Sequence, residues 1–134
     1  MYRASVSNCG DSKFCAKTLH GEFVIDTEGG GSNPIDTLLA SLCGCIGHEV
    51  RDVMGRNQIA YSSFVVKAET DLTRDKTRLA DISVSLEFDG VNPDEQVRAS
   101  IMAAAEGCKI RNTLRANSQV DISLVFRNSV HSAA

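Results

Sequence analysis

Two of the five cysteines, Cys45 and Cys108, lie well inside stretches that are predicted to form amphipathic helices. Cys45 belongs to the stretch from Asn33 to about Met54, and Cys108 to the stretch from Asn92 to about Leu114. Two such helices packed together could bring the two thiols into disulfide range. One thiolate could then attack a substrate while the second thiol resolves the product. The pair therefore predicts thiol-based redox chemistry.

Such chemistry requires a means of activating Cys45. A free thiol has a pKa of about 8.5, so only a few per cent of it is thiolate at neutral pH. Cys45 lies 12 positions after Asn33, too far along its own helix to benefit from the helix dipole. We therefore expect a cation nearby: either Lys13, if its loop folds over the site, or Arg111, on the same helical face as Cys108. His48, three residues after Cys45, could orient or deprotonate the thiol, although a plain surface or interface histidine is the commoner case.

The other three cysteines carry a weaker signal. Cys43 is two positions before Cys45, which turns the two side chains about 200° apart on a helix, so we expect Cys43 to pack in the core. Cys9 and Cys15 lie in or near a predicted loop and are interpreted as incidental thiols, because no second Cys/His pair has the spacing of a zinc site. No metal is expected. An odd cysteine count and an N-terminus without a hydrophobic signal region predict a reducing cytoplasmic location rather than a disulfide framework.

Length and charge exclude several classes of protein. A chain of 134 residues is expected to form one domain spanning residues 1–134. Its net charge of −3 provides no basic stripe for a general nucleic-acid binder. No apolar run approaches the roughly 18 residues that a membrane span needs.

The elements that must position the two cysteines follow from periodicity. Both predicted helices open with Asn-Pro and an acid in the first turn, as in Asn33-Pro34-Ile35-Asp36, and Asp36 is interpreted mainly as an acid that favours the helix dipole. Strands are predicted from residue patterns at about 2–7, 22–26, 59–68, 79–88 and 120–126. Residues 128–134 are expected to be a frayed tail. The predicted class is α+β.

Two motifs resemble a known family. The segment Gly31–Cys45, with its Asn33-Pro34 start, Leu38-Leu39 and terminal cysteine, is similar to the first cysteine helix of the OsmC/Ohr superfamily. The segment Ala103–Leu114 is similar to the second cysteine helix of that superfamily, which usually contains Cys-Pro-Val-Ser-Asn-x-Leu. The resemblance implies an α+β domain in which two long central helices are wrapped by antiparallel sheets. It also implies an intertwined homodimer with its sites at the subunit interface.

The resemblance further implies a function. Members reduce organic hydroperoxides in oxidative-stress defence, with a first cysteine that attacks the peroxide and a second that resolves it. Carried onto this chain, these are Cys45 and Cys108. The implied reductant is a dithiol of the lipoyl type or a small thiol, and no metal or flavin cofactor is implied. An apolar pocket that includes Phe64 or Phe88 would favour alkyl hydroperoxides over hydrogen peroxide.

The chain departs from the peroxidase-active branches at three positions. Ile35 replaces a glutamate that directly follows the Asn-Pro pair, with Asp36 as the neighbouring acid. Lys13 is the nearest cation to the place of an arginine in an N-terminal loop, and Lys109 replaces the proline after the second cysteine. These departures keep an alternative open: a non-enzymatic dimer that binds a small apolar or acyl ligand or senses redox state, with mainly structural cysteines.

Overall fold

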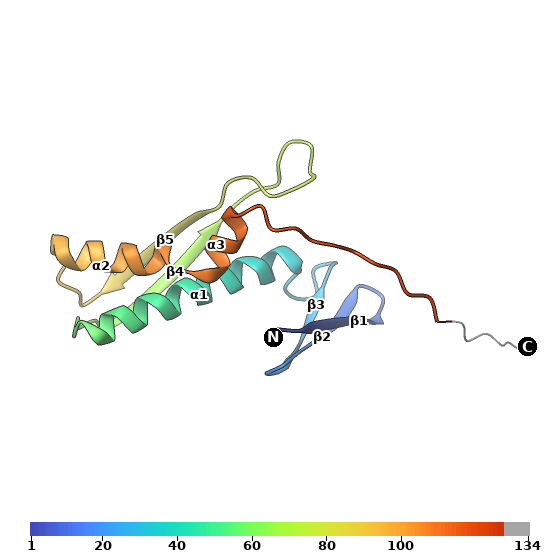
Figure 1. Cartoon of the computed structure of the whole chain (residues 1–134), viewed down its shortest axis with the longest axis horizontal. Coiled ribbons are helices and arrows are strands. Elements are labelled where there is room, and N and C mark those ends of the chain that lie inside the picture. The colour runs from blue at the N-terminus through green and yellow to red at the C-terminus, as the bar shows by residue number, and fades with distance from the viewer. Residues whose placement is uncertain (128–134) are drawn as a thin grey trace, which may run out of the picture.

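The computed structural model describes residues 1–127, so the tail expected at 128–134 lies outside the described residues. Figure 1 shows an N-terminal sheet beside the start of a long helix, and a second sheet packed with the helices. The elements in chain order are β1 (Ala4–Gly10), β2 (Lys13–Thr18), β3 (Glu22–Asp26), α1 (Pro34–Arg56), β4 (Ser63–Glu69), β5 (Ser83–Asp89), α2 (Glu95–Glu106) and α3 (Lys109–Arg115).

The predicted α+β class with antiparallel sheets is confirmed. β1, β2 and β3 form one antiparallel meander, and β4 pairs with β5 in a second antiparallel sheet with Phe64 opposite Phe88. Strand β2 is an addition to the predicted strands, since the expectation for Lys13 and Cys15 is a position in or near a loop. Its alternation of half-buried Phe14 and buried Ala16 with exposed Lys13 and Lys17 gives it one apolar face.

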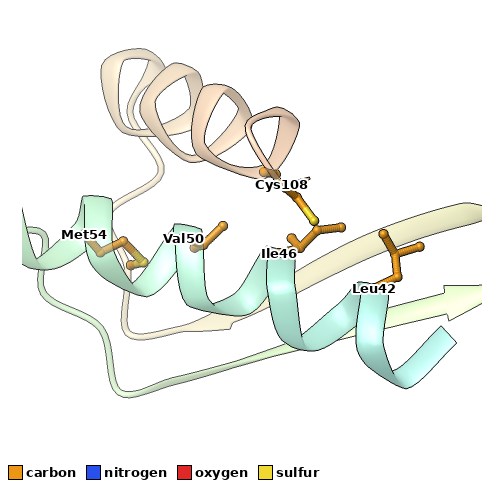
Figure 2. Packing of buried hydrophobic residues seen from close by; sticks show 6 residues of the cluster. Leu42, Ile46, Val50, Met54 and Cys108 are labelled. Carbon is orange, nitrogen blue, oxygen red and sulfur yellow. The ribbon is translucent and has the colours of Figure 1, made fainter. Parts of the chain in front are cut away.

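The core lies between α1, the α2–α3 segment and one face of the β4–β5 sheet. The buried residues of α1 recur every four positions, on one stripe of the helix: Leu42, Ile46, Val50 and Met54. Ala105 and Cys108 close over this stripe from the other helical segment (Figure 2). The inward side chains of β4 and β5 alternate with exposed ones, which places both helical segments on the same face of the sheet.

The first helix begins where its sequence predicts. Asn33 is the N-cap, Pro34 is the first helical residue, and the side chain of Asn33 accepts a hydrogen bond from the Asp36 N–H at 2.8 Å. Asp36 Oδ2 accepts in return from the Asn33 N–H at 3.0 Å, which completes a capping box. The helix runs to Arg56, two residues beyond the predicted end.

The prediction of one continuous second helix was wrong. Its N-cap is Asp94 rather than Asn92, and the segment is divided at Gly107 and Cys108 into α2 and the short α3. Gly107 ends α2, and Cys108 has an extended backbone with φ −62° and ψ 125°. Cys108 is therefore the N-cap of α3 instead of a residue well inside a helix, and this places the first N–H groups of α3 beside its sulfur.

The strand expected at 120–126 does not form in the single chain that the structure describes. Residues 117–127 carry no regular secondary structure and extend away from the body of the molecule in Figure 1. Val120 and Phe126 are 81% and 86% exposed. The apolar alternation that predicts a strand is present, but no neighbouring strand in the described chain pairs with it.

None of the helices within residues 1–127 combines the length and the apolar character needed to cross a membrane.

Candidate functional site

Cys45 and Cys108 meet where α1 packs against the break between α2 and α3. Cys108 is completely buried, and its side chain points toward α1 near Ile46 (Figure 2). Cys45 is half-buried and packs at the edge of the same cluster, where the Cys108 thiol helps to lower its pKa. The structure therefore brings together the two thiols that the sequence singles out, with the more accessible one on α1.

The surroundings of Cys45 favour its thiolate. Burial is the largest single influence and raises the pKa of the Cys45 thiol, but hydrogen bonds from the Cys108 thiol and from the N–H groups of Ile110 and Lys109 together outweigh it. The pKa of Cys45 therefore lies below its ordinary value, although the negative charge of Glu49 opposes this. The groups that lower this pKa are the Cys108 thiol and, after it, two main-chain donors at the start of α3.

Cys108 is shifted in the opposite direction. Burial raises the pKa of the Cys108 thiol, and its hydrogen bond to Cys45 raises that pKa further by favouring the protonated form. The N–H of Arg111 donates to Cys108 Sγ at 3.4 Å and opposes these effects only in part. The pKa values of two neighbouring thiols are thus moved apart, that of Cys45 downward and that of Cys108 upward. Cys43, a third free thiol, has its pKa raised by burial alone.

The side-chain cations expected to activate Cys45 do not do so in this chain. The guanidinium of Arg111 donates to the Glu106 carbonyl at 3.2 Å and lies 4.0 Å from its carboxylate. Lys13 is exposed on β2 and stands opposite Asp26 of β3, where its charge helps to lower the pKa of Asp26. Neither cation is among the groups that shift the pKa of Cys45 in the described chain, whereas backbone N–H groups are.

The remaining supporting candidates also lie elsewhere. His48 is exposed, with its Nδ1 at 3.5 Å from Arg51 Nη2, and it is not among the groups that perturb Cys45. Asp36 is engaged in the capping box nine positions before Cys45, about 13 Å along the helix axis. The interpretation of Asp36 as a helix-start acid is the one that its contacts favour.

Sequence reasoning missed two contributors to the site. Glu49 follows Cys45 by four residues, which is the spacing of neighbours on one helical face, so this signal was available. The N–H groups of Lys109 and Ile110 left no signal, because every residue except proline carries one. Only the break at Gly107 and Cys108 exposes them.

Cys9 and Cys15 are joined by a disulfide, which corrects their interpretation as incidental free thiols. Their Cα atoms lie 5.9 Å apart across the β1–β2 hairpin. The expectation that all five cysteines are reduced therefore holds for Cys43, Cys45 and Cys108. The hairpin was not foreseen because β2 was taken for a loop.

An apolar groove of about 810 Å³ lies near the thiol pair, between α1, β5, residues 78–82 and the α2–α3 segment, and neither Cys45 nor Cys108 lines it. Leu42, Ile46, Leu86 and Ala105 contribute apolar surface to it. Arginine side chains also line the groove: Arg78, Arg111 and Arg115. The pocket expected around Phe64 and Phe88 is not the one found, because these two rings stack on each other with centroids 5.4 Å apart and pack against the core.

A family model described as OsmC-like protein matches residues 27–123, which include both cysteines of the site. The chain belongs to the OsmC-like protein family. This confirms the resemblance stated from the two cysteine motifs. A comparison with curated proteins finds no match.

Solved OsmC-like structures confirm the fold. The OsmC-like protein from Mycoplasma pneumoniae has a TM-score of 0.77 at 17% identity, over 87% of this chain and 89% of that one. An organic hydroperoxide resistance protein OsmC from Legionella pneumophila has a TM-score of 0.67 at 20% identity, over 87% and 90% of the two chains. An organic hydroperoxide resistance protein from Elizabethkingia anophelis has a TM-score of 0.65 at 19% identity, over 87% and 89%. Identities this low establish the OsmC-like fold alone.

Proposed function

We propose that this OsmC-like protein is a thiol peroxidase that reduces organic hydroperoxides in oxidative-stress defence. The observation that carries the proposal is the packing of the half-buried Cys45 of α1 against the cluster that contains the buried Cys108, with the pKa of Cys45 lowered and that of Cys108 raised. A low-pKa nucleophile beside a protonated second thiol is what a two-cysteine mechanism requires. The names of the two hydroperoxide resistance proteins with this fold also support the assignment.

The chemistry follows from the division of roles. The Cys45 thiolate attacks the terminal peroxide oxygen, the O–O bond breaks, and Cys45 becomes a sulfenic acid. The departing alkoxide takes the proton that Cys108 donates to Cys45, which leaves an alcohol and a Cys108 thiolate. That thiolate attacks the sulfenic sulfur, so that a Cys45–Cys108 disulfide forms and the expelled hydroxide takes up a proton from solvent to become water. A dithiol then restores both thiols by attacking the half-buried Cys45 sulfur, because Cys108 is inaccessible.

The proposal is tested on the wild-type protein. One equivalent of cumene hydroperoxide should produce an intrachain Cys45–Cys108 disulfide, found by peptide mass spectrometry, while Cys43 stays free. With a dithiol such as dihydrolipoamide, cumene hydroperoxide should be consumed faster than hydrogen peroxide, because the apolar groove beside the thiols favours an organic group. Reduced protein that leaves cumene hydroperoxide unchanged would contradict the proposal.

A ligand-binding function is the second candidate, and the groove is the observation that favours it. Its apolar lining and the side chains of Arg78 and Arg115 suit a small acyl ligand with an anionic end, although Asp81 and Glu106 also line it. If reduced wild-type protein does not consume hydroperoxide but binds a fatty acid in an equilibrium titration, this function replaces the first.

We also propose that the chain works as an intertwined homodimer. Its accessible surface is 10518 Å², about half as much again as the roughly 6,800 Å² of a compact monomer of 14.4 kDa. Part of the excess is the face of the β1–β3 sheet on which Val6 is 51% and Phe23 46% exposed. The extended apolar residues after α3 add to it. A second copy of the chain would cover such surfaces.

We expect light scattering to give twice the chain mass of 14.4 kDa at micromolar concentration. Phe23→Lys should shift the protein toward the monomer, because the change places a charge on the apolar face of the first sheet. Lys17→Gln is the control, because Lys17 lies on the opposite face of the same sheet. This variant should keep the mass of the wild type. A stable, folded wild-type monomer would contradict the dimer.

A further inference from the structure

The Cys9–Cys15 disulfide, like the Cys43 thiol, takes no part in the proposed peroxidase chemistry. It crosslinks β1 and β2 next to their turn, and Cys9 lies at the register irregularity between Asn8 and Gly10. Figure 1 places this hairpin in the N-terminal sheet, separate from the sheet that packs on the thiol pair. Cys9 is exposed and Cys15 is half-buried. A reagent in solution therefore reaches the disulfide first at Cys9.

Hydrogen bonds hold the turn independently of the disulfide. The side-chain amide of Asn8 donates to the carbonyls of Asp11 and Lys13, each at 3.2 Å. Ser12 Oγ donates to Asp26 Oδ1 at 2.9 Å, and the Thr27 N–H donates to the Ser12 carbonyl at 3.0 Å. A crosslink between residues six apart also closes only a short loop, so it removes little entropy from the unfolded chain. The hairpin should therefore keep its structure when the sulfur–sulfur bond opens.

The disulfide occupies the polar face of its sheet. Cys15 pairs across the ladder with Ser7 and Val24, and Lys13 and Lys17 share its face of β2. Lys17 lies 3.6 Å from Glu22, so that the charges around Cys15 are paired rather than of one sign. The apolar residues Phe14 and Ala16 point to the opposite face. An attacking thiolate thus meets a hydrated surface with no excess of negative charge.

We propose that Cys9 and Cys15 form a second redox-active dithiol/disulfide couple, which a dithiol reductant opens by attack at the Cys9 sulfur. A thiolate of the reductant bonds to Cys9, the Cys9–Cys15 bond breaks, and Cys15 leaves as a thiolate that takes up a proton. The second thiol of the reductant then attacks the mixed disulfide, which frees Cys9 and leaves the reductant as a cyclic disulfide. Two electrons and two protons pass from the reductant to the hairpin.

The proximity of the two cysteines selects a dithiol over a monothiol. Cys15 remains beside Cys9 after the first step, with the Cα atoms 5.9 Å apart, so it can attack the mixed disulfide and expel a monothiol. A dithiol completes the reaction because its own second thiol is equally close. This couple is independent of Cys45 and Cys108 and does not rest on the peroxidase proposal.

The test uses the full-length Cys45→Ser/Cys108→Ser protein, in which Cys9, Cys15 and Cys43 are the remaining cysteines. In native buffer, dithiothreitol should change the alkylated cysteines from Cys43 alone to Cys9, Cys15 and Cys43, while far-UV circular dichroism stays constant. 2-Mercaptoethanol at equal thiol concentration should open the disulfide several-fold more slowly, and oxidised glutathione should restore it. Opening that requires denaturant, or that abolishes the circular dichroism signal, would overturn the proposal.

Two further measurements keep the test valid if the double variant does not fold. Peptide mapping of wild-type protein treated with dithiothreitol locates alkylation at Cys9 and Cys15 directly, whatever happens at the other pair. The matched Cys9→Ser protein should expose Cys15 to alkylation before any reductant is added and show no further dithiol-dependent change there. Cys9 and Cys15 that both alkylate in untreated, air-purified wild type would show that no disulfide exists to open.

Discussion

Cys45→Ser protein should consume cumene hydroperoxide no faster than the reaction without protein, because serine provides no thiolate to attack the peroxide. Cys43→Ser is the matched control, since it removes a free thiol two positions away on the same helix whose pKa is raised by burial. The control should keep the wild-type rate. The measurement is steady-state hydroperoxide loss with dihydrolipoamide in excess.

Cys108→Ser completes this prediction by separating the two roles. The variant should still react once, and a dimedone-type probe should trap a sulfenic acid at Cys45. Turnover should then fail unless the dithiol attacks the sulfenic acid directly, because no second thiol remains to resolve it. Cys45→Ser should show no sulfenic acid at Cys108. Dimedone labelling of Cys108 in that variant would reverse the assignment.

Lys109→Pro should slow alkylation of Cys45 about tenfold at neutral pH, since one hydrogen bond to a charged group contributes about 1.5 kcal/mol. The substitution removes the Lys109 N–H, which helps to lower the pKa of Cys45. Proline fits here, because Lys109 is the first residue of α3 and Cys108 already has the extended backbone that precedes proline. Because less of Cys45 is thiolate at a given pH in this variant, the pH profile of its alkylation rate should move to higher pH.

Lys109→Ala is the control for this variant, because it removes the ammonium group and keeps the N–H. Its rate of reaction with iodoacetamide should stay close to that of the wild type across the pH range. If both variants slow equally, the lysine charge rather than the backbone donor activates Cys45. If neither slows, the N–H of Lys109 has no part in activation.

The first cysteine helix could be read from the sequence almost completely. Asn33, Pro34 and Asp36 are a local start signal, and the four-residue recurrence of apolar residues fixes the buried side of α1. Local signals failed at the second helix. Cysteine is not a favoured N-cap, and Gly107 has φ −82°, so the usual left-handed glycine that ends a helix is absent. At the break between α2 and α3, Cys108 packs against α1. The periodicity of apolar residues along one segment carries no information about such a contact.

The predicted strands succeed or fail according to whether a partner strand is available, which is also a matter of tertiary contact. Segment 22–26 and the β4–β5 pair have neighbours close in sequence, so their patterns lead to strands. Residues 120–126 have the same alternation but no described neighbour, and a strand needs a partner to satisfy its backbone groups. The Cys9–Cys15 disulfide was missed because two cysteines six residues apart indicate a crosslink only when a hairpin between them is recognised.

Main-chain N–H groups help to lower the pKa of Cys45, and this affects which substitutions the sequence can accept near the site. A side-chain ligand such as an arginine disappears with a single substitution, whereas the N–H groups of Lys109 and Ile110 survive every replacement except proline. The side chains at these two positions are therefore free to change while the thiolate keeps its support, provided that the chain still bends at Gly107 and Cys108. An OsmC-like chain with Ile35 and Lys13 in place of the peroxidase glutamate and arginine can in this way retain an activated cysteine.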